Sequence, residues 1–264
     1  MKTDTVITKG IEMPYITFGT GERAFVILPG LSVKSVLFSA KPIENGYKCF
    51  SEKYTVYVFD RRTNLPERYS IKDMADDTAV VMEALGIRDA DVFGASQGGM
   101  IAMCLAAYHP AMVHSLALGS TSPRCEDTIR MTCEKWIAYA EAGDLTGLTG
   151  DYLDRLFSVN TIRQFRDYLI HMNDNASEED LRHFIILAQA IVDFDMRDDL
   201  KKITCPTLAI GAENDLTISV GGTYEIAEAL GCEMYIYGSE YGHCVFDEAP
   251  DYKQRLMEFF DKHR

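Results

Sequence analysis

The segment Gly94-Ala95-Ser96-Gln97-Gly98 lies between a strand-like run, Asp91-Val92-Phe93, and the long apolar run of residues 99–107. Glycine, serine and glycine at this spacing are typical of a sharp turn from a strand into a helix. Small residues at both ends of the motif let the strand and the helix approach closely. Such a turn leaves the Ser96 hydroxyl exposed beside helix N-terminal amides. We therefore interpret Ser96 as a nucleophile, and the alternative is an ordinary glycine-rich turn.

The composition indicates one globular body and limits its partners. A chain of 264 residues fits one α/β domain of roughly 200–250 residues plus an insertion. The net charge of −14 disfavours nucleic acid or an anionic membrane as a partner, because no basic face would offset phosphate repulsion. Residues 1–5 lack the apolar stretch of a signal peptide, and no apolar run approaches the ~18 residues of a membrane span. We expect a small-molecule substrate, and a monomer or homodimer.

The seven cysteines are odd in number and none is spaced as Cys-x-x-Cys. Without a secretory signal, this pattern predicts reduced thiols in a cytoplasmic protein. Paired spacing would be needed for a structural zinc site, so no metal is expected.

Strand-like and helical patterns alternate along much of the chain. Six short apolar runs are predicted as strands, at residues 24–28, 54–59, 90–93, 113–118, 207–210 and 233–237, and residues 6–18 predict a short antiparallel hairpin before them. Helical periodicity at 72–85 and 222–230 ends each time at a glycine, Gly86 and Gly231. This alternation predicts an α/β fold with a mostly parallel central sheet flanked by helices.

Residues 124–196 break the alternation, because they contain no convincing strand. Helices are predicted at 128–142, 149–157, 162–172 and 178–193, the last opened by Ser177 with Asp180 three residues on. An insertion that leaves the sheet after one strand and returns at the next is typical of a cap. We therefore expect residues 1–123 and 197–264 to form the core and residues 124–196 a helical cap, or lid.

A serine nucleophile needs a base, and the base needs an orienting carboxylate. His243 follows the last predicted strand and is preceded by Gly242, whereas Asp215 lies in the loop after residues 207–210. Serine, aspartate and histidine then occur in the chain order of the α/β-hydrolases. Glu213 is the rival carboxylate. The other five histidines are less suited as the base: His109, His114, His171, His183 and His263. Of these, His171 and His183 lie in the predicted cap and could touch substrate.

Backbone N–H groups near Ser96 would have to hold the oxyanion that forms during attack. Gln97 supplies one such N–H by its position after the serine. We predict that Leu31, in the turn Pro29-Gly30-Leu31-Ser32, supplies the other, and the alternative is that Gly30 only makes a turn. This chemistry requires neither a cofactor nor a metal.

With these residues in hand, the chain resembles the α/β-hydrolase fold family, in its branch of capped esterase-like and C–C hydrolase-like enzymes. The resemblance covers nearly the whole chain. Beyond the Ser96 turn, it is carried by Val26–Gly30, Phe59-Asp60-Arg61-Arg62, Tyr108–Val113 and Gly242-His243 with Glu248-Ala249-Pro250. Two positions depart from the family pattern: Pro29 stands where histidine is usual, and Thr63 where glycine is common.

The resemblance implies a serine hydrolase that acts on a small or medium carboxylic ester, lactone or thioester. Two alternatives stay open, namely C–C bond hydrolysis with the same triad and a slow-turnover ligand-binding protein. Aromatic residues of the predicted cap could line an apolar pocket or form the core of the cap: Trp136, Phe157, Phe165, Tyr168 and Phe184. Arg124 and Arg130 could meet a substrate carboxylate or be solvated.

Overall fold

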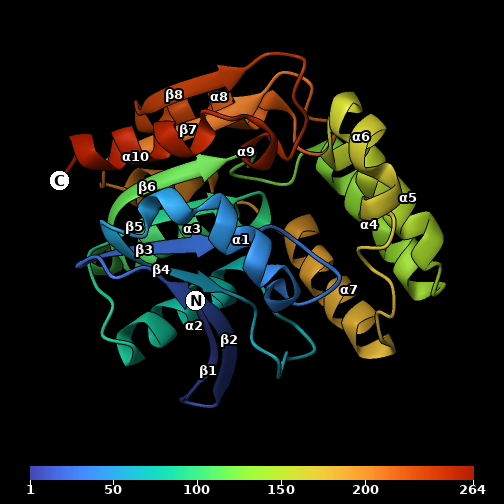
Figure 1. Cartoon of the computed structure of the whole chain (residues 1–264), viewed down its shortest axis with the longest axis horizontal. Coiled ribbons are helices and arrows are strands. Elements are labelled where there is room, and N and C mark those ends of the chain that lie inside the picture. Colours follow the sequence, from blue (N-terminus) through green and yellow to red (C-terminus); the bar gives the residue numbers. More distant parts are fainter.

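The computed structural model describes residues 1–264 and contains one eight-stranded sheet in the order β1-β2-β4-β3-β5-β6-β7-β8 (Figure 1). The β1–β2 and β2–β4 pairs are antiparallel, and every other neighbouring pair is parallel. The predicted α/β class with a mostly parallel sheet is confirmed. The strands are β1 Lys2–Thr8, β2 Ile11–Phe18, β3 Arg23–Leu28, β4 Tyr54–Phe59, β5 Ala90–Ala95, β6 Val113–Gly119, β7 Thr207–Ala212 and β8 Glu233–Tyr237.

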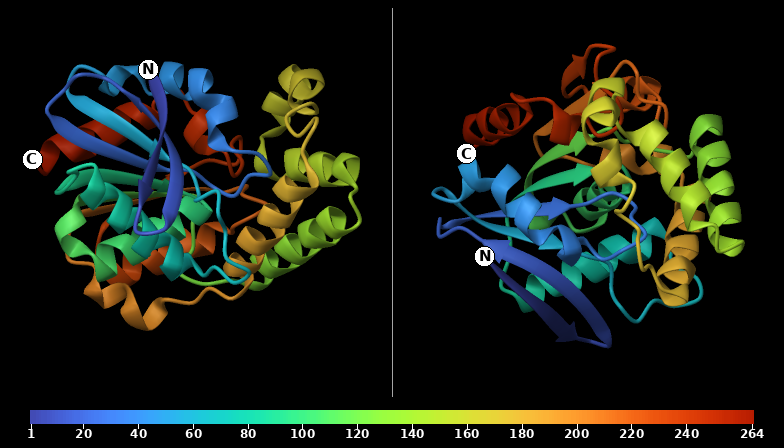
Figure 2. Two further views of the ribbon diagram at one scale, coloured as in Figure 1. Left: turned by 90° about the horizontal axis from the view of Figure 1, so that it is seen from below. Right: turned by 45° about the vertical axis from the view of Figure 1, so that its right-hand side comes forward.

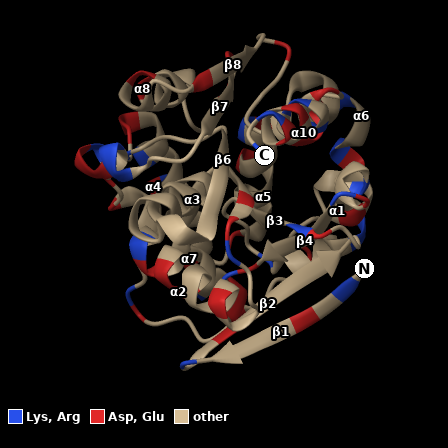
Figure 3. Ribbon diagram, turned by 90° about the vertical axis from the view of Figure 1, so that its left-hand side faces the viewer, with Lys and Arg blue, Asp and Glu red and all other residues tan.

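Helices cover both faces of the sheet, so the central strands are apolar on both sides. In β3, Val26 and Leu28 join the core cluster on one face, whereas Phe25 and Ile27 join the cluster on the other. The first face packs against α2 Ile71–Ala84, α3 Gln97–Tyr108 and α8 Val220–Leu230, and the second against α1 Ala40–Gly46, α9 Val245–Glu248 and α10 Tyr252–Lys262. The interior strands β6 and β7 carry no Lys, Arg, Asp or Glu (Figure 3).

Four helices follow β6 before the chain returns at β7: α4 Asp127–Glu141, α5 Leu145–Leu156, α6 Val159–Leu169 and α7 Glu178–Val192. They stand at the side to which the arrowheads of the parallel strands point (Figures 1 and 2). At their base, Cys125 N–H donates to the Phe194 carbonyl and Met196 N–H to the Pro123 carbonyl. None of the helices in the molecule combines the length and apolar character that crossing a bilayer requires.

Several boundaries differ from the sequence-based expectation. The N-terminal hairpin begins at Lys2, not Val6, and α1 and α10 were not predicted. Helix α5 begins at Leu145, not Thr149, because the Asp144 side chain accepts from Gly147 N–H and caps the helix. Helix α6 spans Val159–Leu169, not 162–172, because Ser158 caps it in the same way.

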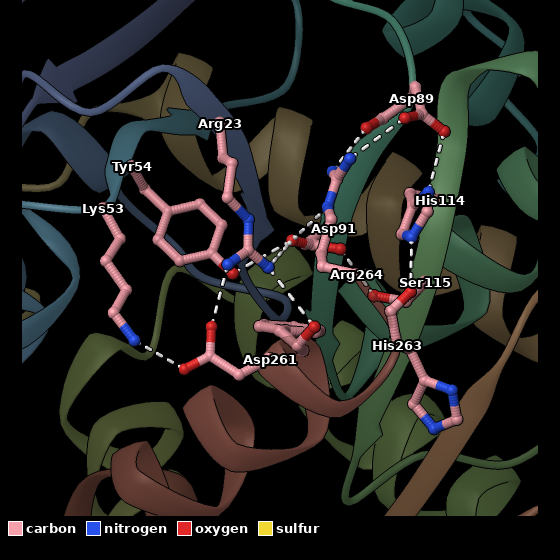
Figure 4. A network of polar contacts seen from close by, with 11 residues as sticks. Arg23, Lys53, Tyr54, Asp89, Asp91, His114, Ser115, Asp261, His263 and Arg264 are labelled. Atoms are coloured by element: carbon pink, nitrogen blue, oxygen red, sulfur yellow. Dashed lines mark hydrogen bonds and ion pairs between the residues drawn. The ribbon is translucent and has the colours of Figure 1, made fainter.

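At the amino ends of the strands, a polar network surrounds Asp91, whose side chain is fully buried (Figure 4). The Asp91 carboxylate accepts hydrogen bonds from Arg23, Tyr54, Ser115 and Arg264, at 2.6–3.3 Å. These donors come from β3, β4, β6 and the segment after α10. The network therefore joins four strands and the C-terminal segment at the end of the sheet opposite Ser96.

Candidate active site

Ser96 occupies the junction between β5 and α3, with φ 55° and ψ −124°. This conformation is rare for a residue with a side chain. The two glycines of the motif make the junction sterically possible. A Cβ on Gly94 would lie 2.4 Å from the Gly98 carbonyl oxygen, and a Cβ on Gly98 would lie 1.9 Å from the Leu28 carbonyl oxygen. The spacing of the motif thus follows from the close contact of β3, β5 and α3.

The pairing of β3 with β5 also brings the loop after β3 to Ser96. Leu28 pairs with Gly94, so Gly30 reaches the serine, and a Cβ on Gly30 would lie 3.1 Å from the Ser96 Cβ. The N–H of Leu31, the next residue, has no hydrogen-bond acceptor within the protein. Gln97 is the first residue of α3, where an N–H has no acceptor within the helix. Two free N–H groups therefore lie on the segments that flank Ser96.

Asp215 and His243 come from the adjacent loops that follow β7 and β8. Thr217 N–H and Ile218 N–H both donate to Oδ1 of Asp215, each at 2.8 Å. Oδ2 remains available to His243, and its distance to Nδ1 is 2.7 Å. The Asp215 side chain is 1% exposed and the His243 side chain 3%. Because Nδ1 carries this hydrogen bond, Nε2 is the imidazole nitrogen left to exchange a proton with another group.

The other titratable candidates are not part of this arrangement. Glu213 is exposed and its carboxylate has no hydrogen-bond partner. The remaining five histidines contact acidic side chains elsewhere: His109 with Asp76, His114 with Asp89, His171 with Asp174, His183 with Glu179 and His263 with Glu233. None of them lines the cavity that contains Ser96.

Ser96, His243 and Leu31 line one cavity of about 260 Å³, and 14 of its 25 lining residues are hydrophobic. Helices α4 and α5 and the residue after α5 contribute an apolar wall that includes Ile129, Trp136, Tyr152, Leu156 and Phe157. Of the aromatic residues considered from the sequence, Trp136 and Phe157 thus line the cavity. Phe165 and Tyr168 are exposed, and Phe184 is buried in the core.

Neither arginine considered for a substrate carboxylate lines this cavity. Arg124 pairs with Glu225, and Arg130 donates to the Val192 carbonyl. No group of three His, Cys, Asp or Glu side chains is arranged to hold a metal ion.

Two residues beside the site were not assigned a role from the sequence. Nη2 of Arg61 donates to the Pro29 carbonyl at 2.8 Å and to Oε1 of Gln97 at 2.9 Å. Tyr152, on α5, donates its hydroxyl to the Leu31 carbonyl. Arg61 stands in the Asp60-Arg61 pair that carries part of the family resemblance, so a signal existed. Tyr152 had none, because 121 residues separate it from Leu31.

A family model described as the alpha/beta hydrolase fold matches residues 23–250. The chain belongs to the α/β-hydrolase fold family. The match covers every strand from β3 onward, the four helices between β6 and β7, and all five residues predicted from the sequence to form the site.

Individual members of the α/β-hydrolase family resemble this chain at low identity. A protein of Pantoea ananatis named as the carbamate hydrolase RutD is 26% identical over 216 residues, which is 76% of this chain and 76% of that protein. The 3-oxoadipate enol-lactonase 1 of Acinetobacter baylyi is 24% identical over 195 residues, or 69% and 70% of the two chains. The crystal structure of the enol-lactonase from Burkholderia xenovorans superposes with a TM-score of 0.85 at 20% identity, covering 98% and 100%. At this identity the structural likeness shows the fold alone.

Proposed function

We propose that this chain is a serine hydrolase that cleaves a small or medium carboxylic ester, lactone or thioester through an acyl-enzyme on Ser96. The observation that carries the proposal is the buried hydrogen bond between Asp215 and His243, whose imidazole lines the same cavity as Ser96. Relatives named for the hydrolysis of an enol-lactone and of a carbamate support acyl chemistry, since a lactone is a cyclic ester.

In this mechanism, His243 Nε2 takes the proton of the Ser96 hydroxyl while Oγ attacks the carbonyl carbon. Asp215 holds the imidazole in the required tautomer and stabilises its protonated form. The N–H groups of Gln97 and Leu31 stabilise the tetrahedral oxyanion. His243 then gives its proton to the leaving alcohol or thiol, and water, activated by the same imidazole, releases the acyl group.

The apolar wall supports a substrate with an uncharged acyl group. Lys34 and Asp247 are the charged residues that line the cavity, and the Asp247 carboxylate is 3.2 Å from the Lys253 ammonium. In this proposal residues 124–196 act as a cap that excludes water and limits acyl length. All seven cysteines are free, which is in keeping with the reducing compartment predicted for the protein.

Labelling with a fluorophosphonate probe tests the nucleophile, because the probe forms a covalent bond with an activated serine. We expect stoichiometric labelling of the native protein and none of Ser96→Ala. Labelling that survives the substitution would place the nucleophile elsewhere. A matched control is Ser120→Ala, since Ser120 is a buried serine whose hydroxyl has no hydrogen-bond partner and which lies outside the cavity.

Turnover of p-nitrophenyl acetate distinguishes the hydrolase from a slow ligand-binding protein of the same fold. A burst of one equivalent of p-nitrophenol followed by steady release would support the acyl-enzyme. A burst with no further release would favour the ligand-binding alternative.

A further inference from the structure

The loop that carries Leu31 has little backbone support of its own. Strand β3 ends at Leu28, and no backbone hydrogen bond holds Pro29, Gly30 or Leu31 in place. Two side chains hold it instead. Arg61 donates to the Pro29 carbonyl, and Tyr152 donates to the Leu31 carbonyl. The peptide group that carries the Leu31 N–H lies between these two carbonyls, so hydrogen bonds from outside the loop hold the backbone on both sides of it.

Tyr152 is itself held firmly within α4 and α5. It is buried, and its ring centroid lies 4.6 Å from that of Trp136. Trp136 Nε1 in turn donates to Asp151 at 2.8 Å. Burial holds the pKa of the Tyr152 phenol well above its usual value, so the hydroxyl stays protonated and available as a donor. The phenol thus supplies a fixed donor to the Leu31 carbonyl.

Gln97, which would supply the other N–H, is also connected to the α4–α7 helices. Its Nε2 donates to the Leu187 carbonyl on α7 at 2.7 Å, and its Oε1 accepts from Arg61. These two partners fix the orientation of the side-chain amide, with Nε2 toward Leu187 and Oε1 toward Arg61. Leu31 and Gln97, the two residues with a free N–H near Ser96, are therefore each hydrogen-bonded to one of the α4–α7 helices.

We propose that Tyr152 is a positioning residue for the oxyanion hole: its hydroxyl holds the Leu31 segment so that the Leu31 N–H meets the tetrahedral oxyanion. The proposal rests on the proposed function. It gives α5 a role in the chemistry in addition to lining the cavity. Support for this loop comes from the Tyr152 hydroxyl on one side of the Leu31 N–H and from Arg61 on the other.

Tyr152→Phe removes the hydroxyl and keeps the ring. Because removing an oxyanion-hole donor costs about 100- to 1,000-fold in kcat and Tyr152 acts one step from the donor, we expect a loss of about tenfold in kcat, with KM changed less than about twofold. The affinity for butylboronic acid, which forms a tetrahedral adduct with the serine, should fall in parallel with kcat. The affinity for butyrate, the acid product of a butyryl ester, should not fall. Tyr139→Phe on α4 is the matched control, since the Tyr139 hydroxyl makes no hydrogen bond and lies outside the cavity.

A merely structural role would raise KM and weaken butyrate and boronate alike, and that result would overturn the proposal. An unchanged kcat would overturn it as well. If Tyr152→Phe is without effect while Ser96→Ala abolishes turnover, this inference fails and the proposed function stands. If Ser96→Ala retains turnover and the native protein does not bind the boronate, the proposed function itself fails.

Discussion

Nδ1 of His243 lies 2.7 Å from Oδ2 of Asp215, and the other oxygen of that carboxylate is occupied by two backbone N–H groups. These hydrogen bonds fix the orientation of the carboxylate. Because Nδ1 of the imidazole is bonded to it, Nε2 is the nitrogen that can exchange a proton with a group in the cavity. Glu213, two residues earlier, faces solvent. We therefore expect turnover to depend on the Asp215 carboxylate and not on that of Glu213.

Asp215→Asn should lower kcat for p-nitrophenyl acetate by about 10⁴-fold, the loss known for the equivalent change in a serine protease triad, because the amide favours the wrong imidazole tautomer. Glu213→Gln should leave kcat within about twofold, because the His243 imidazole loses no hydrogen-bond partner. Steady-state kinetics of the two purified variants provide the comparison. A larger loss for the Glu213 variant would mean that the acid is misassigned.

Trp136→Ala should raise activity on an octanoyl ester relative to an acetyl ester, because the indole forms part of the cavity wall. Phe184→Ala should leave this ratio unchanged and destabilise the protein by about 3–5 kcal/mol, the usual cost of deleting a buried phenylalanine side chain. Phe184 is fully buried and lies outside the cavity. The measurements are kcat/KM for both esters and urea unfolding. Equal losses on both esters for Trp136→Ala would remove the support for a lid.

Asp91→Asn should destabilise the protein by about 3 kcal/mol, since it leaves two arginines beside a neutral group at a buried site. The arginine side chains retain some solvent contact, so we expect the lower end of the range for buried pairs. Asp89→Asn is the control, because its side chain is 64% exposed and such pairs contribute about 0–1 kcal/mol. Urea unfolding measures both variants. A changed kcat in folded Asp91→Asn would contradict the purely structural role of this network.

The stability contributed by Asp151 should be lost at acidic pH. Burial alone would raise its pKa, but hydrogen bonds from Lys135 and Trp136 and the charge of Arg155 outweigh burial and hold the pKa below 3.8. A depressed pKa adds stability above the unfolded value of 3.8, and that stability disappears as the pH falls through the folded pKa. The difference in unfolding free energy between native protein and Asp151→Asn should therefore be constant near neutrality and shrink below about pH 4. A difference that persists at lower pH would show that the carboxylate charge is not what stabilises α4 and α5.

Much of the fold was predictable because its signals are local. The central strands are short apolar runs, and the turn at Ser96 requires glycine on both sides. Asp215 and His243 could be placed together because both follow strands whose carboxyl ends meet at one edge of the sheet. The start of α5 was harder to predict. Gly147 and Gly150 lie in its first half and lower its helix propensity, so the helical spacing of the buried Tyr152 and Leu156 indicated only its second half.

Other features had no local signal. Helix α1 buries only Ala40 and contains a proline and a glycine, so it shows no apolar periodicity. The contacts of Tyr152 with Leu31 and of Gln97 with Leu187 join residues 121 and 90 positions apart. Only the packing of the α4–α7 helices against the loop after β3 and against the start of α3 creates them. Helix α10 is different, since its buried Tyr252, Leu256 and Phe259 follow helical spacing and could have been recognised.

The backbone of Ser96, at φ 55°, costs the folded chain about 1–3 kcal/mol for a residue with a Cβ. Glycine would relieve that strain, whereas alanine would not. The residue that we propose as the nucleophile is thus one whose side chain the backbone conformation at this position disfavours. A copy of this protein released from selection for turnover would gain thermodynamic stability if glycine replaced Ser96, so one stabilising substitution separates this scaffold from a descendant without the serine.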